Sequence, residues 1–168
     1  GAERFGAWFV ARASPSPGWL LAMFSHADLN HLVANILFLL LWGTIAEHVL
    51  GARRYGAFLA AAGVAGILAQ VAEYVLTGIT GGIVGASGAT QATAAFAAVA
   101  LARGHGPFET RAMRRGLFTA AVVVVTLQLV NDFAGVSTVV PESSGAAHLT
   151  GVTIGVAYAL IETRRAVS

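Results

Sequence analysis

Cysteine and lysine are absent from this chain of 168 residues, and charged side chains of every kind make up only 11% of it. Without cysteine there is no disulfide framework and no thiolate chemistry. The ten basic residues are all arginines that lie between apolar runs, so no basic stripe with interleaved aromatics is available to bind nucleic acid. The chain is 57% hydrophobic, with a mean hydropathy of +0.74, which is typical of a membrane protein.

Long windows without charged side chains divide the sequence. They predict an all-α, polytopic helical membrane bundle, because each window approaches the roughly 20 residues that cross a bilayer. The expected helices cover about 29–50, 55–76, 87–102, 115–132 and 147–163 in one domain of residues 1–168, with 1–28 as an outer loop region. Arginines occupy alternate connections and the tail, so those ends are expected in the cytoplasm and the first, third and fifth helices run parallel.

Three sets of polar residues are expected at one depth in this bundle. Ser87 is sixteen residues before Arg103, and His148 is sixteen before Arg164, so each lies about 24 Å above its cytoplasmic arginine at 1.5 Å per residue. Asn35 lies about 27 Å above the arginine that follows its helix and belongs to the same layer. Polar groups in hydrocarbon cost several kcal/mol unless something compensates, so this layer is a candidate functional site.

Ser87 and His148 have the chemistry of a catalytic dyad. A serine hydroxyl becomes a nucleophile when an adjacent base takes its proton, and neutral imidazole suits that exchange near neutral pH. Gly85 and Gly88 allow a sharp turn around Ser87 and a close approach to a substrate. The free N–H groups at the start of the serine helix suit a developing oxyanion.

His31 and Asn35 are one helical turn apart, so they share a face, and both can donate hydrogen bonds to that oxyanion. No third member of a triad is evident. Asp132 and Glu142 precede His148 in the sequence, but nothing in the spacing puts either carboxylate behind the imidazole. The sequence therefore predicts a mechanism with two catalytic residues.

Each of these residues also has an ordinary structural explanation. Ser87 could simply cap a helix N-terminus, His148 could be hydrogen-bonded at a helix interface, and Asn35 could join neighbouring helices as polar residues do in membrane bundles. Their common depth and direction favour the functional interpretation. A metal site is not supported, since there is no His-Glu-x-x-His helix and these side chains make a poor set of zinc ligands; no cofactor is expected.

The order and spacing of the motifs carry a family resemblance. His26, His31 and Asn35 give His-x4-His-x3-Asn, Gly-x-Ser-Gly follows at 85–88, and Ala-His-Leu-Thr-Gly comes at 147–151. This ordered set resembles the rhomboid family of intramembrane serine proteases, from about Trp19 to Arg165. The resemblance implies a six-helix core embedded in the cell membrane as a multi-pass protein, and substrates that are themselves transmembrane proteins within the lipid bilayer.

The same resemblance implies a role for each residue. Ser87 is the nucleophile, His148 is the general base and then acid, and His31, Asn35 and the Ser87 backbone N–H form the oxyanion site. Gly151 and Gly155 belong to a repeat of small residues at every fourth position. In the family this seam packs the last helix against the serine helix, as close packing in lipid also demands.

Three features depart from the family pattern. Only about thirty residues precede His31, so the first core helix is expected to be absent and about five of the six to be present. Leu20 follows Trp19 where many relatives have arginine. Gln91 stands where bacterial relatives often have a tyrosine beneath the catalytic histidine; its amide could orient His148 by a hydrogen bond instead, but the stacking contact would be lost.

The predicted activity is hydrolysis of a peptide bond in or near the transmembrane helix of another membrane protein. Residues 133–147, which contain Gly135, Pro141 and Gly145, form the candidate lid over the site. The alternative is a non-catalytic rhomboid-like module that binds or escorts transmembrane segments; such relatives lose the serine or the histidine, whereas this chain retains both. A small channel or transporter is disfavoured because no inverted repeat is evident.

Overall fold

The computed structural model describes residues 8–134 and 144–165, and within these ranges the protein is all-α. Two short helices, α2 (Gly18–Leu21) and η1 (Ala22–Phe24), come first. α3 (Leu29–Phe38) continues through the π-helical turn η2 (Leu39–Gly43) into α4 (Thr44–Leu50), and α5 (Ala52–Thr77), α6 (Ser87–Ala102), α7 (Arg111–Ala134) and α8 (Gly145–Arg165) follow. The five long helices predicted from the charge-free windows are therefore present, with bounds shifted by a few residues at most.

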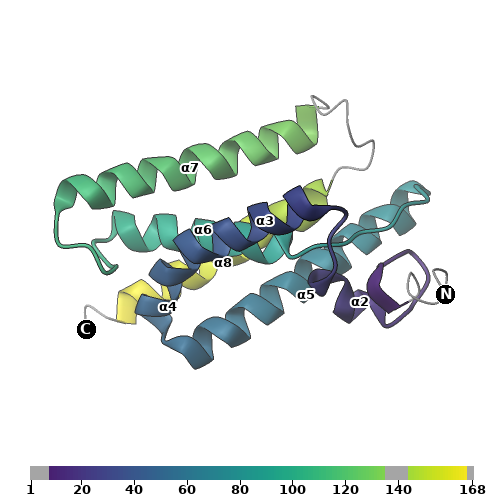
Figure 1. The fold of residues 1–168 in the computed structure, drawn as a ribbon, viewed down its shortest axis with the longest axis horizontal. Coiled ribbons are helices and arrows are strands. Elements are labelled where there is room, and N and C mark those ends of the chain that lie inside the picture. Colours follow the sequence, from purple (N-terminus) through teal and green to yellow (C-terminus); the bar gives the residue numbers. More distant parts are fainter. Residues whose placement is uncertain (1–7, 135–143, 166–168) are drawn as a thin grey trace.

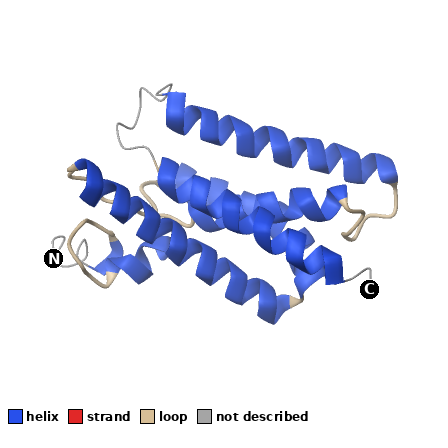
Figure 2. Cartoon of the chain, turned by 180° about the vertical axis from the view of Figure 1, so that it is seen from behind, coloured by secondary structure: helices blue, strands red, loops and turns tan. Residues whose placement is uncertain are grey.

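Helix α6 lies at the centre of the bundle (Figure 1). It is in contact with α5, α7, α8 and the α3–α4 helix, and almost all of its side chains are buried. α3, α6 and α8 run in one direction, whereas α5 and α7 run in the other (Figure 1); Figure 2 shows the same bundle of helices from behind. The parallel arrangement predicted for the first, third and fifth long helices is confirmed.

In the part of the chain that the structure describes, four helical segments are long and apolar enough to cross a membrane: Leu29–Leu50, Ala52–Thr77, Arg111–Ala134 and Gly145–Arg164. α6 is shorter, with 16 residues, and therefore extends over only about 24 Å. Its neighbours surround it and bury almost all of its side chains, and a helix too short to cross the bilayer is tolerated where protein covers it. The two arginine-bearing links between long helices, 51–54 and 103–115, and the arginines at the end of α8 lie at one end of the bundle, the left end in Figure 1, whereas Arg12 lies in the N-terminal segment at the other end; this bias is the one that the positive-inside rule describes.

Local sequence sets two boundaries near the site. The Asp28 carboxylate caps α3 by accepting a hydrogen bond from the backbone N–H of His31 at 2.8 Å, which satisfies one of the unpaired donors at the helix start. Gly51 separates α4 from α5 with a φ of 76°. Because side chains strain that backbone conformation, glycine allows the chain to reverse sharply there.

A seam of small residues joins α8 to α6. A Cβ added at Gly151 would lie 2.1 Å from the carbonyl oxygen of Gly88, and one added at Gly155 would lie 2.1 Å from that of Ala92. The backbones of the two helices therefore approach each other more closely than any side chain allows. This confirms the predicted packing of the last helix against the serine helix.

The backbone that leads into α6 is anchored to the N-terminal segment. Ala11 and Ile83 exchange two backbone hydrogen bonds of 3.1 and 2.9 Å, and the N–H of Gly85 donates to the carbonyl of Ala22 at 2.9 Å. These bonds satisfy backbone groups that no helix pairs. They fix the approach of the chain to Ser87, the first residue of α6.

Candidate active site

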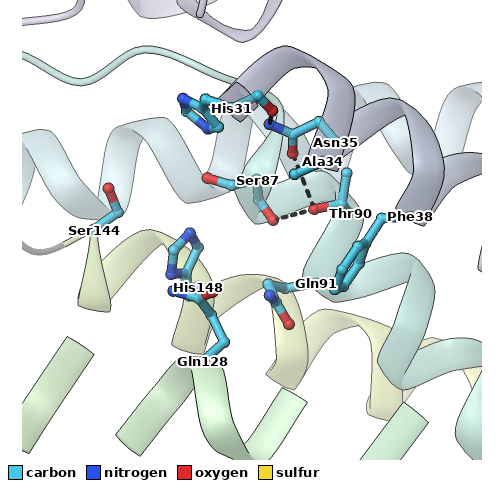
Figure 3. Close-up of a pocket in the computed structure, with 10 residues that line it drawn as sticks. All are labelled: His31, Ala34, Asn35, Phe38, Ser87, Thr90, Gln91, Gln128, Ser144 and His148. Carbon is cyan, nitrogen blue, oxygen red and sulfur yellow. Dashed lines mark hydrogen bonds between the residues drawn. The ribbon is translucent and has the colours of Figure 1, made fainter. Parts of the chain in front are cut away.

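The candidate residues converge at one end of the parallel helices. Ser87 begins α6, His148 lies in the first turn of α8, and His31 and Asn35 lie one turn apart on α3. They line one pocket of about 190 Å³ (Figure 3). The full lining consists of His31, Ala34, Asn35, Phe38, Ser87, Thr90, Gln91, Gln128, Ser144 and His148.

The hydroxyl of Ser87 does not cap the helix that begins with it. The N-cap of α6 is Ala86, and no side-chain hydrogen bond caps this helix. The ordinary explanation of Ser87 as a helix cap is therefore wrong. Figure 3 shows its side chain pointing into the space between the rings of His31 and His148.

Gly85 allows the histidine of α3 to approach the serine. Its φ is 106°, and a Cβ at this position would lie 2.6 Å from Cε1 of His31. Both the backbone conformation and the space exclude a side chain. The ring of His31 therefore rests against the turn that leads into Ser87. Gly88, on the opposite side of this turn, faces Ala147 of α8, whose carbonyl oxygen would lie 3.2 Å from an added Cβ.

The imidazole of His148 has a carboxylate behind it. Nδ1 of His148 lies 2.6 Å from Oδ2 of Asp132, and their side chains are only 7% and 5% exposed. The expectation that no acid lies behind the imidazole is therefore wrong. Asp132 is sixteen residues before His148 in the sequence, but α7 runs antiparallel to α8 and brings its last turns beside the start of α8.

Gln91 does not hold the histidine as expected. Nδ1 of His148 is paired with Asp132, and Nε2 has no hydrogen-bond partner in the described part of the chain. Neither ring nitrogen is therefore bonded to Gln91. Gln91 lies in the same pocket, and its Oε1 is buried, also without a partner among the described residues. The side chain that extends this network is Gln128, which donates to Asp132 from Nε2 at 3.0 Å.

Ser87 and His148 share the pocket without being hydrogen-bonded to each other. Within residues 8–134 and 144–165, no hydrogen bond joins the hydroxyl to the buried Nε2. The unpaired nitrogen is nevertheless the acceptor that a serine nucleophile requires. Such catalytic bonds are commonly long before substrate binds and shorten in the reacting complex.

Asn35 is held in place by two hydrogen bonds. Its Nδ2 donates to the carbonyl of His31 at 2.9 Å, and its Oδ1 accepts from the Thr90 hydroxyl at 3.3 Å. A primary amide has two N–H groups, so one remains for a ligand in the pocket. The interhelical role considered for Asn35 is real, since Thr90 belongs to α6, and it is compatible with donation to an oxyanion.

The ring of His26 packs edge-on against that of His31, with centroids 5.1 Å apart and planes at 77°. His26 precedes the first long helix and lies outside the membrane-spanning segments. Burial lowers the pKa of His26 from its ordinary value of 6.5, because desolvation disfavours the charged ring. The neutral ring of His26 supports the orientation of His31 at the edge of the pocket.

A buried glutamine on α5 fixes the start of α8. Gln70 is 1% exposed, its Oε1 accepts a hydrogen bond from the backbone N–H of Ala147 at 3.3 Å, and its Nε2 donates to Glu73 at 2.7 Å. This satisfies a helix-start donor next to the residue that carries the imidazole. The contact between Gln70 and α8 was not anticipated from the sequence.

The sequence contained one signal for the Asp132 contact. Gln128 and Asp132 are four residues apart in a helix whose residues from Leu117 on are mostly apolar, so they share a face that must find a polar partner. The candidate lid is a different matter, because residues 135–143 lie outside the described part of the chain. No group of three potential metal ligands is found among the described residues.

A protein-family model for the rhomboid domain matches residues 17–165. The matched range contains every residue of the pocket, the glycine seam and Asp132. A search of curated proteins finds no match to the chain. Rhomboids are generally intramembrane serine proteases. The match spans most of the sequence and agrees with the all-α bundle and its apolar helices, and the chain therefore belongs to the rhomboid family.

Proposed function

We propose that this protein is an intramembrane serine endopeptidase of the cell membrane that cleaves a peptide bond in or near a transmembrane segment of another membrane protein. The observation that carries the proposal is the shared pocket. One pocket of about 190 Å³ contains the Ser87 hydroxyl at a helix start and the imidazole of His148 with its unpaired Nε2. The side chains of His31 and Asn35, which carry N–H donors, line the same pocket. A nucleophile, a base and electrophilic donors in one cavity are the parts that acyl transfer requires.

In the proposed mechanism, the Ser87 oxygen attacks the scissile carbonyl carbon while its proton moves to Nε2 of His148. The carbonyl electron pair moves onto oxygen, and the oxyanion accepts hydrogen bonds from the Ser87 backbone N–H and the side chains of His31 and Asn35. The imidazolium then protonates the leaving amine as the C–N bond breaks. Water repeats the sequence on the acyl-enzyme and releases Ser87.

The depth of the pocket limits the substrate. A transmembrane helix has its carbonyls engaged in hydrogen bonds, so a substrate must unwind locally before Ser87 can reach one. Small or helix-breaking residues near the cleavage point reduce that cost by about 1 kcal/mol for each glycine. We therefore expect substrates with glycine or other poor helix formers close to the outer end of a single membrane span.

A fluorophosphonate probe and a single-span model substrate test the proposal together. The full chain in detergent micelles is expected to form a covalent adduct at Ser87 and to cleave the substrate, and Ser87→Ala is expected to do neither. Ser144→Ala is the matched control, because Ser144 lines the same pocket but lies before α8. It is expected to retain both reactions.

The outcome separates the proposal from its alternative. Absence of labelling and cleavage in the wild-type chain, with retained binding of a transmembrane peptide, would identify a non-catalytic rhomboid-like module. Equal labelling of the wild-type chain and Ser87→Ala would mean that another nucleophile reacts, and would contradict the assignment of Ser87.

A further inference from the structure

The buried contact between Asp132 and His148 has no place in a mechanism with two catalytic residues. It joins α7 to α8 at a distance of 2.6 Å, with both side chains less than a tenth exposed. A buried carboxylate is strongly unfavourable unless hydrogen-bond donors compensate for the lost water. The hydrogen-bond partners of this carboxylate therefore determine which ring nitrogen of His148 carries the proton.

Asp132 has one donor for each oxygen. Oδ1 accepts from Nε2 of Gln128 at 3.0 Å, and Oδ2 faces Nδ1 of His148. An ionised carboxylate only accepts hydrogen bonds. The proton of the neutral imidazole must therefore reside on Nδ1, and Nε2 must carry the lone pair.

The lone pair on Nε2 is the one that the proposed chemistry needs. Nε2 is buried without a hydrogen-bond partner in the described residues, and the ring lines the same pocket as Ser87. We propose that Asp132 is a positioning residue that holds His148 in the tautomer with a free Nε2 and stabilises the imidazolium formed when Ser87 attacks. This inference rests on the proposed protease function and gives the site a third member.

The proton balance of the step is simple. The Ser87 proton moves to Nε2, the ring becomes a cation, and Nδ1–H remains a donor to Asp132, which stays ionised. The positive charge develops next to a carboxylate that water does not screen, where electrostatic stabilisation is large. Gln128 supports this arrangement because its N–H holds the carboxylate in the orientation that faces the ring.

A purely structural role for Asp132 is the competing explanation. By the exposure of the whole residue, Ala121 is the one buried residue of α7, so a polar contact at its end could serve simply to hold the helix against α8. The test must therefore include readouts that helix docking would not change. The tautomer of His148 and the rescue of activity by a rearranged hydrogen-bond network are two such readouts.

Asp132→Asn keeps the size of the side chain but reverses the hydrogen bond. Gln128 offers an N–H and so selects the carbonyl oxygen of the new amide, which turns the amide nitrogen toward Nδ1. Nδ1 then becomes an acceptor, and the ring proton moves to Nε2, where it blocks proton transfer from Ser87. We expect kcat and the rate of fluorophosphonate labelling to fall about 100-fold or more, with KM changed far less.

The double variant Asp132→Asn with Gln128→Glu is designed to restore the tautomer. The introduced glutamate accepts from the amide nitrogen, which turns the amide oxygen back toward Nδ1. We expect this variant to recover at least tenfold of the labelling rate that the single variant loses. Asn131→Ala, one residue away on the exposed side of α7, is the matched control and is expected to react at the wild-type rate.

Nitrogen-15 chemical shifts of His148 report the tautomer independently of activity. The proposal expects a protonated Nδ1 in the wild-type chain and in the double variant, and a protonated Nε2 in Asp132→Asn. Thermal unfolding is measured for all three chains to show that each is folded. The proposal is overturned if Asp132→Asn is labelled at the wild-type rate. It is also overturned if the loss of labelling follows the unfolding of the variant and the double variant does not recover it. If the tautomers are as expected in all three chains but the wild-type chain is not labelled, the result contradicts the protease function and leaves the role of Asp132 in setting the tautomer intact.

Discussion

The seam between α6 and α8 makes Gly155→Ala the most informative substitution outside the pocket. A Cβ at Gly155 would lie 2.1 Å from the carbonyl oxygen of Ala92 and 3.0 Å from its Cα, whereas ordinary contact begins at 3.4 Å. The obstructing atoms belong to the backbone, so no side-chain rotation removes the overlap. α8 must move away from α6 by roughly 1 Å, and such overpacking costs about 1–3 kcal/mol of unfolding free energy.

The same displacement reaches the site because α6 begins with Ser87 and α8 carries His148 two turns before the glycine. A misplacement of about 1 Å between reacting groups costs on the order of 100-fold in rate. Gly155→Ala is therefore expected to lower both the midpoint of thermal unfolding in micelles and the rate of fluorophosphonate labelling at Ser87. Both are measured on the same preparation.

Gly116→Ala is the matched control for this experiment. Gly116 lies in α7, and a Cβ added there meets no heavy atom within 4 Å. Since alanine favours helix over glycine by up to about 1 kcal/mol, the control is expected to be as stable as the wild-type chain or slightly more stable. If Gly155→Ala matches the control in both stability and labelling rate, the inference that backbone contact at the seam sets the distance between the helices is refuted.

Three further predictions concern side chains around the pocket. Gln70→Leu removes the acceptor for the backbone N–H of Ala147 and is expected to lower the unfolding free energy by about 1–3 kcal/mol, as for other buried donors left unpaired. Asn35→Ala removes a proposed oxyanion donor and is expected to lower kcat about 100-fold with little effect on KM. His26 has a pKa below 6.5 in the folded protein because of burial, so the unfolded chain binds more protons and stability falls as the pH drops below about 6.5. His26→Phe is expected to reduce that loss in unfolding measured across pH 5 to 7.5.

Each of these has a clear contrary result. If Gln70→Leu has the same unfolding free energy as the wild-type chain, the backbone N–H of Ala147 has found another acceptor. A change in KM without a change in kcat for Asn35→Ala would assign the amide to substrate binding instead of the oxyanion. An unchanged pH dependence in His26→Phe would show that other groups, among them His31, account for the loss of stability in acid.

The long helices could be predicted because they depend on short-range physics. Charge-free windows of sufficient length must be helical in a bilayer, where every backbone group needs a partner within its own segment. The equal spacing of Ser87 and His148 from Arg103 and Arg164 placed them at one end of their helices, because the rise per residue is constant. Gly151 and Gly155 predicted a close approach for the same kind of reason, since small residues recur on one helix face.

The partners of the polar side chains could not be predicted in this way. Gln91 has the right spacing after Ser87 to reach the histidine, but the ring is held by Asp132. The difference depends on how α7 is rotated and how far it slides along α8, and sequence spacing contains neither quantity. A hydrogen bond between helices requires positions correct to within a few tenths of an ångström, which only the packing of the whole bundle determines.

The amino-acid sequence by itself determined that this is a membrane-embedded helical bundle, which helices run parallel, and which serine and histidine lie at a common depth. These properties follow from hydropathy, charge placement and the regular geometry of the helix. The tertiary structure alone decided that Asp132 stands behind His148, that Ala86 rather than Ser87 occupies the N-cap position of α6, and that Gln70 holds the start of α8. Each of these depends on contacts between segments far apart in the sequence, where the relative rotation of helices decides which side chains meet.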